Sequence, residues 1–196
     1  DPNPEPAAEG EEQELQTAEV HMELDDGVYV AEQGWVENAA GYTFHNWYGF
    51  GAMDVSAALA MAESYDASNS AVGELAKTDW FRVAHTNLEI PLGSAQGAVS
   101  ELHIPLDLTV ETIQIKTRVI HDNLSTLGFE LISPSGTRSI LLNTANGYNE
   151  MALDGKVMTS NAFYGEEAQG TWTLKVVNPF VGVQGSLYEW SMRVYG

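Results

Sequence analysis

Serine, histidine and aspartate are the residues through which this 196-residue sequence could perform nucleophilic catalysis. Such a triad needs a Ser activated by a His that an Asp orients. The sequence lacks the nucleophile motif Gly-x-Ser-x-Gly, the zinc motif His-Glu-x-x-His, a phosphate-binding Gly-rich loop with Lys and a dinucleotide-binding fingerprint. It also lacks cysteine, which removes thiolate chemistry and disulfides. These routes of catalysis are therefore excluded for the sequence.

Histidines are the next candidates, as bases or as metal ligands. The sequence has five, and they are scattered without the spacing of a metal site. We interpret each as a packed or hydrogen-bonded side chain, and the one at the end of a predicted strand as a strand-end hydrogen bonder. The five are His21, His45, His85, His103 and, at the strand end, His121.

Loop carboxylates are numerous enough to supply a calcium ion, which takes roughly six to eight oxygen ligands. Ca2+ is therefore a candidate ligand. The alternative is that these acids are simply solvated, because they form no dense Asp-x-Asp string. A thermal midpoint that does not respond to a chelator would exclude a structural calcium. The candidate ligands are Asp107, Asp122, Asn123 and Glu166, with Glu167 beside the last.

Aromatic residues are concentrated between residues 29 and 50, where they are too numerous for a linker. This part of the chain must pack against something, so its aromatics are candidate docking residues. They are Trp35, Phe44, Trp47, Tyr48 and Phe50. Phe129, Trp172 and Trp190 could instead stack on a sugar, but they lie on alternating apolar faces and we expect them in the core.

Charge divides the chain into two unlike pieces. The formal net charge is −20, which argues against a nucleic-acid or anionic-membrane partner. Residues 1–76 contain 16 acidic residues and no Lys or Arg, whereas the remainder contains 12 acidic and 8 basic residues. No segment approaches the length of an apolar membrane span. Residues 1–26, rich in Glu, Pro and Ala, are expected to form a solvated, poorly ordered arm.

The elements that must position these side chains follow from hydrophobic periodicity. Asp54 is a candidate N-cap for a short helix over about residues 54–64, because Val55, Ala58, Leu59 and Ala62 form one apolar stripe. Small polar residues at 67–77 predict a linker. Beyond it, short segments alternate apolar and polar residues, as at residues 113–119, 172–176 and 190–194.

Residues 129–142 predict a β-hairpin. The turn is Ser133-Pro134-Ser135-Gly136-Thr137, in which Ser suits the first position of a type I turn, Pro the second and Gly the fourth. Many short alternating strands and one short helix predict an all-β protein. We expect an antiparallel jelly-roll β-sandwich, preceded by an extended segment and that helix.

The second piece of the sequence resembles a known family. Its matching blocks are His121, Leu127–Thr137, Tyr164-Gly165-Glu166, Gly170–Val176, Gly185-Ser186-Leu187, Trp190 and Tyr195-Gly196. In order and spacing they are similar to the P domain, or homo B domain, of kexin- and furin-like subtilisin-family serine proteases. One departure is that Thr126-Leu127 stands where the family has Asp-Leu.

The first piece resembles the C-terminal end of the catalytic domain of the same proteases. The resemblance is carried by Gly34-Trp35, residues 38–41, Phe44-His45, residues 48–51 and Asp54. It implies that the catalytic Asp, His and Ser would lie upstream of Asp1. It also implies domains at 1–66 (arm and catalytic-domain tail), 67–77 (linker) and 78–196 (P domain).

The resemblance implies a non-catalytic fragment of a secreted, bacterial-type serine endopeptidase that docks on the catalytic domain and stabilises it. Its partner would be that domain, joined covalently or in trans, and no nucleic acid or membrane partner is expected. The alternative is a free-standing β-sandwich that binds a protein or glycan. A third interpretation is a regulatory partner that binds an intact protease.

Overall fold

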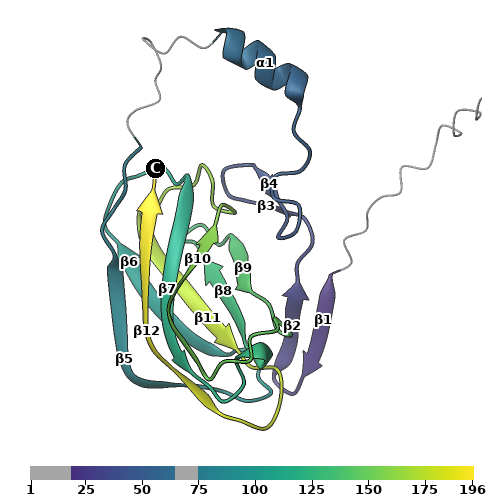
Figure 1. The fold of residues 1–196 in the computed structure, drawn as a ribbon, viewed down its shortest axis with the longest axis vertical. Helices are drawn as coiled ribbons and strands as arrows, with labels where there is room; N and C mark the ends of the chain where they lie inside the picture. The colour runs from purple at the N-terminus through teal and green to yellow at the C-terminus, as the bar shows by residue number, and fades with distance from the viewer. Residues whose placement is uncertain (1–18, 65–74) are drawn as a thin grey trace, which may run out of the picture.

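The computed structural model describes residues 19–64 and 75–196. Two four-stranded antiparallel sheets pack face to face and form the body of the molecule (Figure 1). The strand order is β10-β7-β12-β5 in one sheet and β6-β11-β8-β9 in the other. This arrangement confirms the predicted antiparallel β-sandwich. The strands are β5 (Phe81–Ile90), β6 (Ala98–Ile104), β7 (Thr112–Ile120), β8 (Gly128–Ile132), β9 (Arg138–Leu142), β10 (Ala152–Ser160), β11 (Gly170–Val177) and β12 (Gly185–Tyr195).

The core lies between the two sheets and is formed by the inward positions of the alternating strands. In β7, every second residue from Ile113 to Val119 is buried. Phe129, Trp172 and Trp190 are fully buried, which confirms that they are core residues. The two indoles still need hydrogen-bond acceptors there. Trp172 Nε1 donates to the carbonyl of Ala168 (2.8 Å), and Trp190 Nε1 donates to Ser100 Oγ (2.7 Å).

The predicted hairpin is present as β8 and β9. The amide of Gly136 donates to the carbonyl of Ser133 (3.0 Å), which is the hydrogen bond of the predicted four-residue turn. Gly136 has a φ of 92°, a value that favours glycine because it carries no Cβ. A short 3-10 helix, η1 (Leu124–Thr126), precedes the hairpin, and the Asn123 side chain caps it by accepting from the amide of Ser125.

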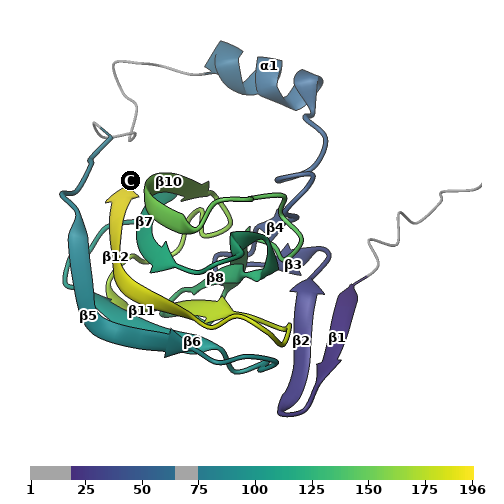
Figure 2. The same cartoon turned by 60° about the horizontal axis from the view of Figure 1, so that its bottom comes forward.

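Residues 19–50, which we call the strap, run along the outside of the sandwich as two small hairpins (Figure 2). They contain β1 (Val20–Leu24), β2 (Gly27–Glu32), β3 (Val36–Glu37) and β4 (Thr43–Phe44). The expectation of a poorly ordered arm over residues 1–26 is wrong for β1, which is a regular strand although three of its five residues are exposed. Val20, Met22 and Leu24 alternate with polar residues, and this period of two lets β1 pair with β2 despite the acidic composition. Residues 1–18 of the predicted arm lie outside the described residues.

One helix, α1 (Val55–Ser64), follows the strap in the described part of the chain, as the fold class predicted. Asp54 caps it, since its Oδ1 accepts from the amide of Ala57 (2.8 Å). Both views show α1 apart from the two sheets (Figures 1 and 2). Most of the predicted linker lies outside the described residues. The last residues of the predicted linker are part of the sandwich, because the amide of Ala76 donates to the carbonyl of Gly196 (2.6 Å).

Among residues 19–64 and 75–196, no helix is long and apolar enough to cross a membrane.

Candidate docking surface

The strap is attached to the sandwich through its first turn. Asp26 lies between β1 and β2, and its carboxylate accepts from Ser94 Oγ (2.6 Å) and from the amide of Ala95 (2.6 Å). These hydrogen bonds, first the one from Ser94 and then the one from Ala95, lower the pKa of Asp26 below its ordinary value. The ionised carboxylate therefore attaches the first turn of the strap to the loop between β5 and β6.

Tyr29 of β2 forms the apolar contact between strap and sandwich. Its side chain is buried with Ala31, Ala95 and Val177 in a small core separate from the main one. Burial, followed by the negative charge of Glu130, raises the pKa of the Tyr29 hydroxyl above its ordinary value. Gly128 of β8 lies directly beneath the ring, where a Cβ would collide with the hydroxyl oxygen. The strap therefore depends on a glycine in the sandwich.

A buried ion pair on the outer face of the second sheet supports the middle of the strap. Arg138 of β9 donates to both oxygens of Glu130, at 2.9 and 2.6 Å, and Glu130 is only 2% exposed. The same guanidinium donates to the carbonyl of Val30 and to the side chain of Gln33. Burial lowers the pKa of Arg138, but the hydrogen bonds and charge of Glu130 outweigh it, so the pKa is raised. The guanidinium therefore stays charged and holds Val30 and Gln33 of the strap.

Glu166 holds the next part of the strap. Its Oε1 accepts from the amide of Ala39 (3.1 Å) and from the hydroxyl of Thr137, in the turn between β8 and β9. Asn38 lies beside it and donates to the carbonyls of Ala162 and Tyr164. Glu166 Oε2 is buried and has no hydrogen-bond partner among the described residues.

Most of the predicted docking aromatics pack in two groups of rings in the second half of the strap. Ring centroids lie 5.4 Å apart for Phe44 and Phe50 and 6.1 Å apart for Trp35 and Tyr48. His45 packs between Trp35 and Tyr48, and Tyr164 joins from the sandwich. One group is Trp35, His45 and Tyr48, and the other is Tyr42, Phe44, Phe50 and Tyr164. We call the two groups together the aromatic cluster.

The aromatic cluster remains open to solvent. Trp35, Tyr42, Tyr48 and Phe50 are each more than 40% exposed. A hollow of about 470 Å³ lies beside Tyr42, Phe50 and Tyr164. Several exposed aromatic side chains in one short segment are typical of an interaction site in soluble proteins. It is thus the strongest candidate docking surface in the described part of the chain.

Helix α1 adds apolar surface that follows the cluster directly in sequence. Every residue from Val55 to Glu63 is exposed, and Val55 and Leu59 are each about 60% exposed. A helix of ten residues has little stability in water on its own, because nucleation is costly and few hydrogen bonds follow it. The apolar face of α1 therefore needs a packing partner.

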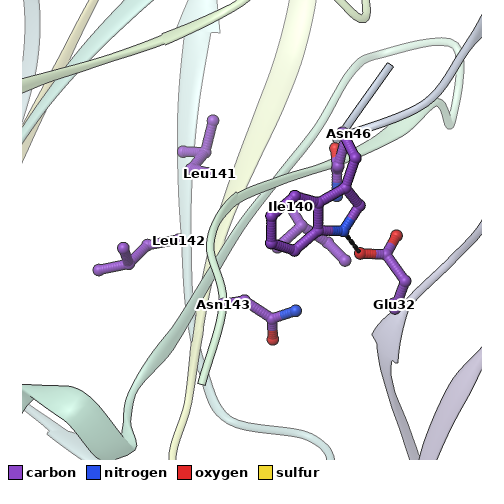
Figure 3. A pocket seen from close by; sticks show the side chains of 7 residues that line it. Glu32, Asn46, Ile140, Leu141, Leu142 and Asn143 are labelled. Carbon is purple, nitrogen blue, oxygen red and sulfur yellow. Dashed lines mark hydrogen bonds between the residues drawn. The ribbon is translucent and has the colours of Figure 1, made fainter. Parts of the chain in front are cut away.

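Trp47 differs from the other predicted docking residues. It is 76% exposed and stacks on none of the rings of the aromatic cluster. Instead its indole Nε1 donates to Glu32 Oε2 (2.8 Å), as the dashed line in Figure 3 shows. This bond aims the ring toward β9, where it lines a hollow of about 240 Å³. The lining residues are Glu32, Asn46, Trp47, Ile140, Leu141, Leu142 and Asn143.

The calcium candidates do not come together as a ligand group. Asp107 and Asp122 are exposed, Asn123 caps η1, and the Oε1 of Glu166 holds the strap. Among residues 19–64 and 75–196, no group of three or more His, Asp or Glu side chains is arranged to hold a metal ion.

The histidines are distributed as single residues. The backbone amide of Asn123 donates to His121 Nδ1 (3.0 Å), so the proton lies on Nε2, which donates to the carbonyl of Val183 (2.8 Å). His45 is buried and accepts from the amide of Trp47. His21 and His103 are exposed, and the side chain of His85 lies outside the described residues.

Comparison with known proteins decides the family. A family model for the proprotein convertase P-domain matches residues 110–194, which span β7 to β12. Residues 110–194 therefore belong to the P-domain family of the subtilisin/kexin-like proteases. An extracellular serine protease of Aeromonas sobria is 33% identical over 84% of this chain and 32% of its own length. Human proprotein convertase subtilisin/kexin type 6 is 29% identical over 83% of this chain and 17% of its own length.

Solved structures agree with this assignment. The crystal structure of the Aeromonas sobria serine protease matches with a TM-score of 0.80 and 32% identity. The match covers 91% of this chain and 36% of the protease. The same protease has also been solved in complex with the chaperone ORF2. This chain spans about a third of the Aeromonas relative, and the likeness extends beyond the P domain into the residues that precede it.

Sequence reasoning identified most of the exposed aromatics and missed the polar contacts of the strap. Asp26 and Arg138 lie outside the family blocks, and their roles depend on partners 68 and 108 residues away. Glu130 lies within the family block Leu127–Thr137, which was the available signal for it. Glu166 was identified only as a candidate metal ligand. Its place in a quoted family block, Tyr164-Gly165-Glu166, was the available signal that it has a structural role.

Proposed function

We propose that this P domain is the non-catalytic accessory part of a larger subtilisin-like serine endopeptidase, and that it docks on the catalytic domain and stabilises it. The support is the serine-protease relatives, of which this chain corresponds to about a third or less. The parent protease is proposed to act outside the cell, as the Aeromonas relative does according to its name, an extracellular serine protease.

One observation carries the proposal: the aromatic cluster and α1 each present apolar side chains that the described residues leave exposed. The proposed occupant is the catalytic domain, which corresponds to the larger part of each relative that this chain lacks. Burial of a Phe side chain contributes about 1.5–3 kcal/mol. Several such rings, together with the α1 face, would give an apolar interface like those between domains held in a fixed orientation.

A substitution in the full-length protease tests the docking role. Phe50→Ser removes the ring that contacts Tyr42, Phe44 and Tyr164 in the second group of the cluster. We expect a lower temperature of half-inactivation for proteolysis of a peptide substrate. Val181→Ser, at an 88% exposed site in the loop between β11 and β12, is the matched control and should leave that temperature unchanged. Equal effects of the two substitutions would refute docking through the cluster.

The lack of catalysis has its own test. The isolated chain should not be labelled by a serine-reactive phosphonate probe, whereas the full-length protease should be labelled upstream of Asp1. Labelling of any residue between Asp1 and Gly196 would overturn the proposal. The coding sequence upstream should also contain Gly-Thr-Ser-x-x-x-Pro, which a free-standing binding module would not need.

A further inference from the structure

The free edge of β9 lies against the hollow beneath Trp47. β9 is the last strand of its sheet, with β8 as its only neighbour in that sheet. Ile140 and Leu141 are consecutive, so their side chains point to opposite faces of the strand, yet both line the hollow. A hollow that meets both faces of a strand lies along its edge. We call this site the β9 hollow.

Ile140 directs its backbone polar groups toward the β9 hollow. The amide of Ser133 donates to the carbonyl of Thr137, so this opposed pair is hydrogen-bonded across the hairpin. Paired positions in an antiparallel ladder alternate between bonded and non-bonded. From the register, Arg138 and Ile140 are non-bonded positions. Their N–H and C=O groups therefore point away from β8, toward the free edge.

The strap bridges this edge at its two ends and leaves the middle open. Gln33 Nε2 donates to the carbonyl of Arg138 (2.9 Å), and Asn143 Nδ2 donates to the carbonyl of Ala31 (2.6 Å). Between these bridges β2 and β9 share no backbone ladder, and β2 belongs to a different sheet. Figure 3 shows Glu32 and Asn46 on one side of the opening and Leu141 and Leu142 on the other.

We propose that the β9 hollow binds an extended peptide segment, which adds as a strand along β9 at Ile140 and places a cationic side chain on the Trp47 indole. Unpaired strand edges recruit peptides through main-chain hydrogen bonds, and side pockets select the sequence. The hollow, at about 240 Å³, is smaller than the roughly 300–1,000 Å³ typical of small-molecule sites, so it suits individual peptide side chains.

The charge of Glu32 favours a cationic side chain in the bound peptide. Glu32 is the charged residue among those that line the hollow, and no Lys or Arg lines it. The nearby guanidinium of Arg138 is already paired with Glu130. A Lys or Arg side chain of the peptide would meet both the exposed face of Trp47 and the carboxylate that holds the ring. The site is separate from the aromatic cluster, so it does not depend on the proposed docking to a catalytic domain.

Titration of the intact 196-residue chain with acetyl-Thr-Val-Lys-Val-Thr-amide, followed by NMR, tests the proposal. We expect saturable shifts at the Ile140 amide and the Trp47 indole, and slower hydrogen exchange at the Ile140 amide. The same peptide N-methylated at every backbone amide should not bind, because it cannot donate to β9. Trp47→Ala should weaken binding about fivefold to tenfold. Trp80→Ala, which alters a ring beside Lys116 on the other sheet, should not change it.

The charge contribution is measured separately. Glu32→Gln keeps an acceptor for the indole but removes the charge, so it should weaken the Lys peptide about twofold to fivefold. A peptide with norleucine in place of Lys should bind both proteins equally. Equal binding of the N-methylated peptide, absence of binding at about 5 mM peptide, or saturable binding of cellohexaose at Trp47 without peptide binding would each overturn the proposal.

Discussion

Removal of the Arg138 guanidinium should loosen the strap from the sandwich and leave the buried charge of Glu130 without a partner. Arg138→Met keeps the aliphatic bulk but removes the partner of Glu130, whose side chain is only 2% exposed. Breaking a buried pair by removing one member costs about 3–5 kcal/mol, because the remaining charge is uncompensated. The lost hydrogen bonds to Val30 and Gln33 contribute to the same loss. We expect the free energy of unfolding to fall by about 3–5 kcal/mol.

Equilibrium unfolding in urea, followed by tryptophan fluorescence, measures this change. The double variant Glu130→Gln/Arg138→Met should recover much of the loss, because it removes the stranded charge. Arg82→Met, which breaks an exposed pair with Glu189, is the matched control and should cost less than about 1 kcal/mol. Hydrogen exchange at the amides of β2 should accelerate in Arg138→Met alone. A loss below about 1 kcal/mol, or no recovery in the double variant, would refute the argument.

Three further predictions concern the strap. Acid should weaken its attachment: the pKa of Asp26 is lowered in the folded chain, so its contribution is present above the ordinary value of 3.8 and is lost as pH falls through the folded value. Asp26→Asn should therefore be less stable at pH 7 and equally stable at pH 2 in urea titrations. Alkali should act through Tyr29, whose raised pKa means that stability is full below the ordinary value of 10.0 and declines as pH rises above it. Tyr29→Phe should flatten that decline, and an unchanged slope would contradict the assignment. Gly128→Ala should cost about 1–3 kcal/mol by thermal unfolding, because the new Cβ meets the Tyr29 hydroxyl. Gly136→Asn, in the open turn of the hairpin, is its control and should cost less.

The alternation of apolar and polar residues predicted much of the fold. The turn at Ser133–Thr137 and the buried positions of β7, β11 and β12 follow from local sequence, because strand period and turn chemistry are short-range properties. Composition misled the prediction at β1. Its acidic residues indicated a poorly ordered arm, whereas three alternating apolar residues were enough to pair it with β2.

The candidate docking residues show the same division. Their aromatic character was evident in the sequence, and four of the five lie in the aromatic cluster. Trp47 is as aromatic as the other four, but a single hydrogen bond from its indole to Glu32 directs its ring toward β9. A side-chain orientation set by a partner 15 residues away cannot be obtained from residue type alone.

The sequence by itself determined the sandwich, its hairpin and the P-domain resemblance, because these depend on the order and period of neighbouring residues. Only the tertiary structure decided what each charged and aromatic side chain does. Glu166, expected to be a calcium ligand or a solvated acid, accepts a hydrogen bond from the amide of Ala39 in the strap. Arg138 of β9 donates a hydrogen bond to the carbonyl of Val30. These contacts join residues more than 100 positions apart, and their energies depend on burial, which is a property of the folded chain.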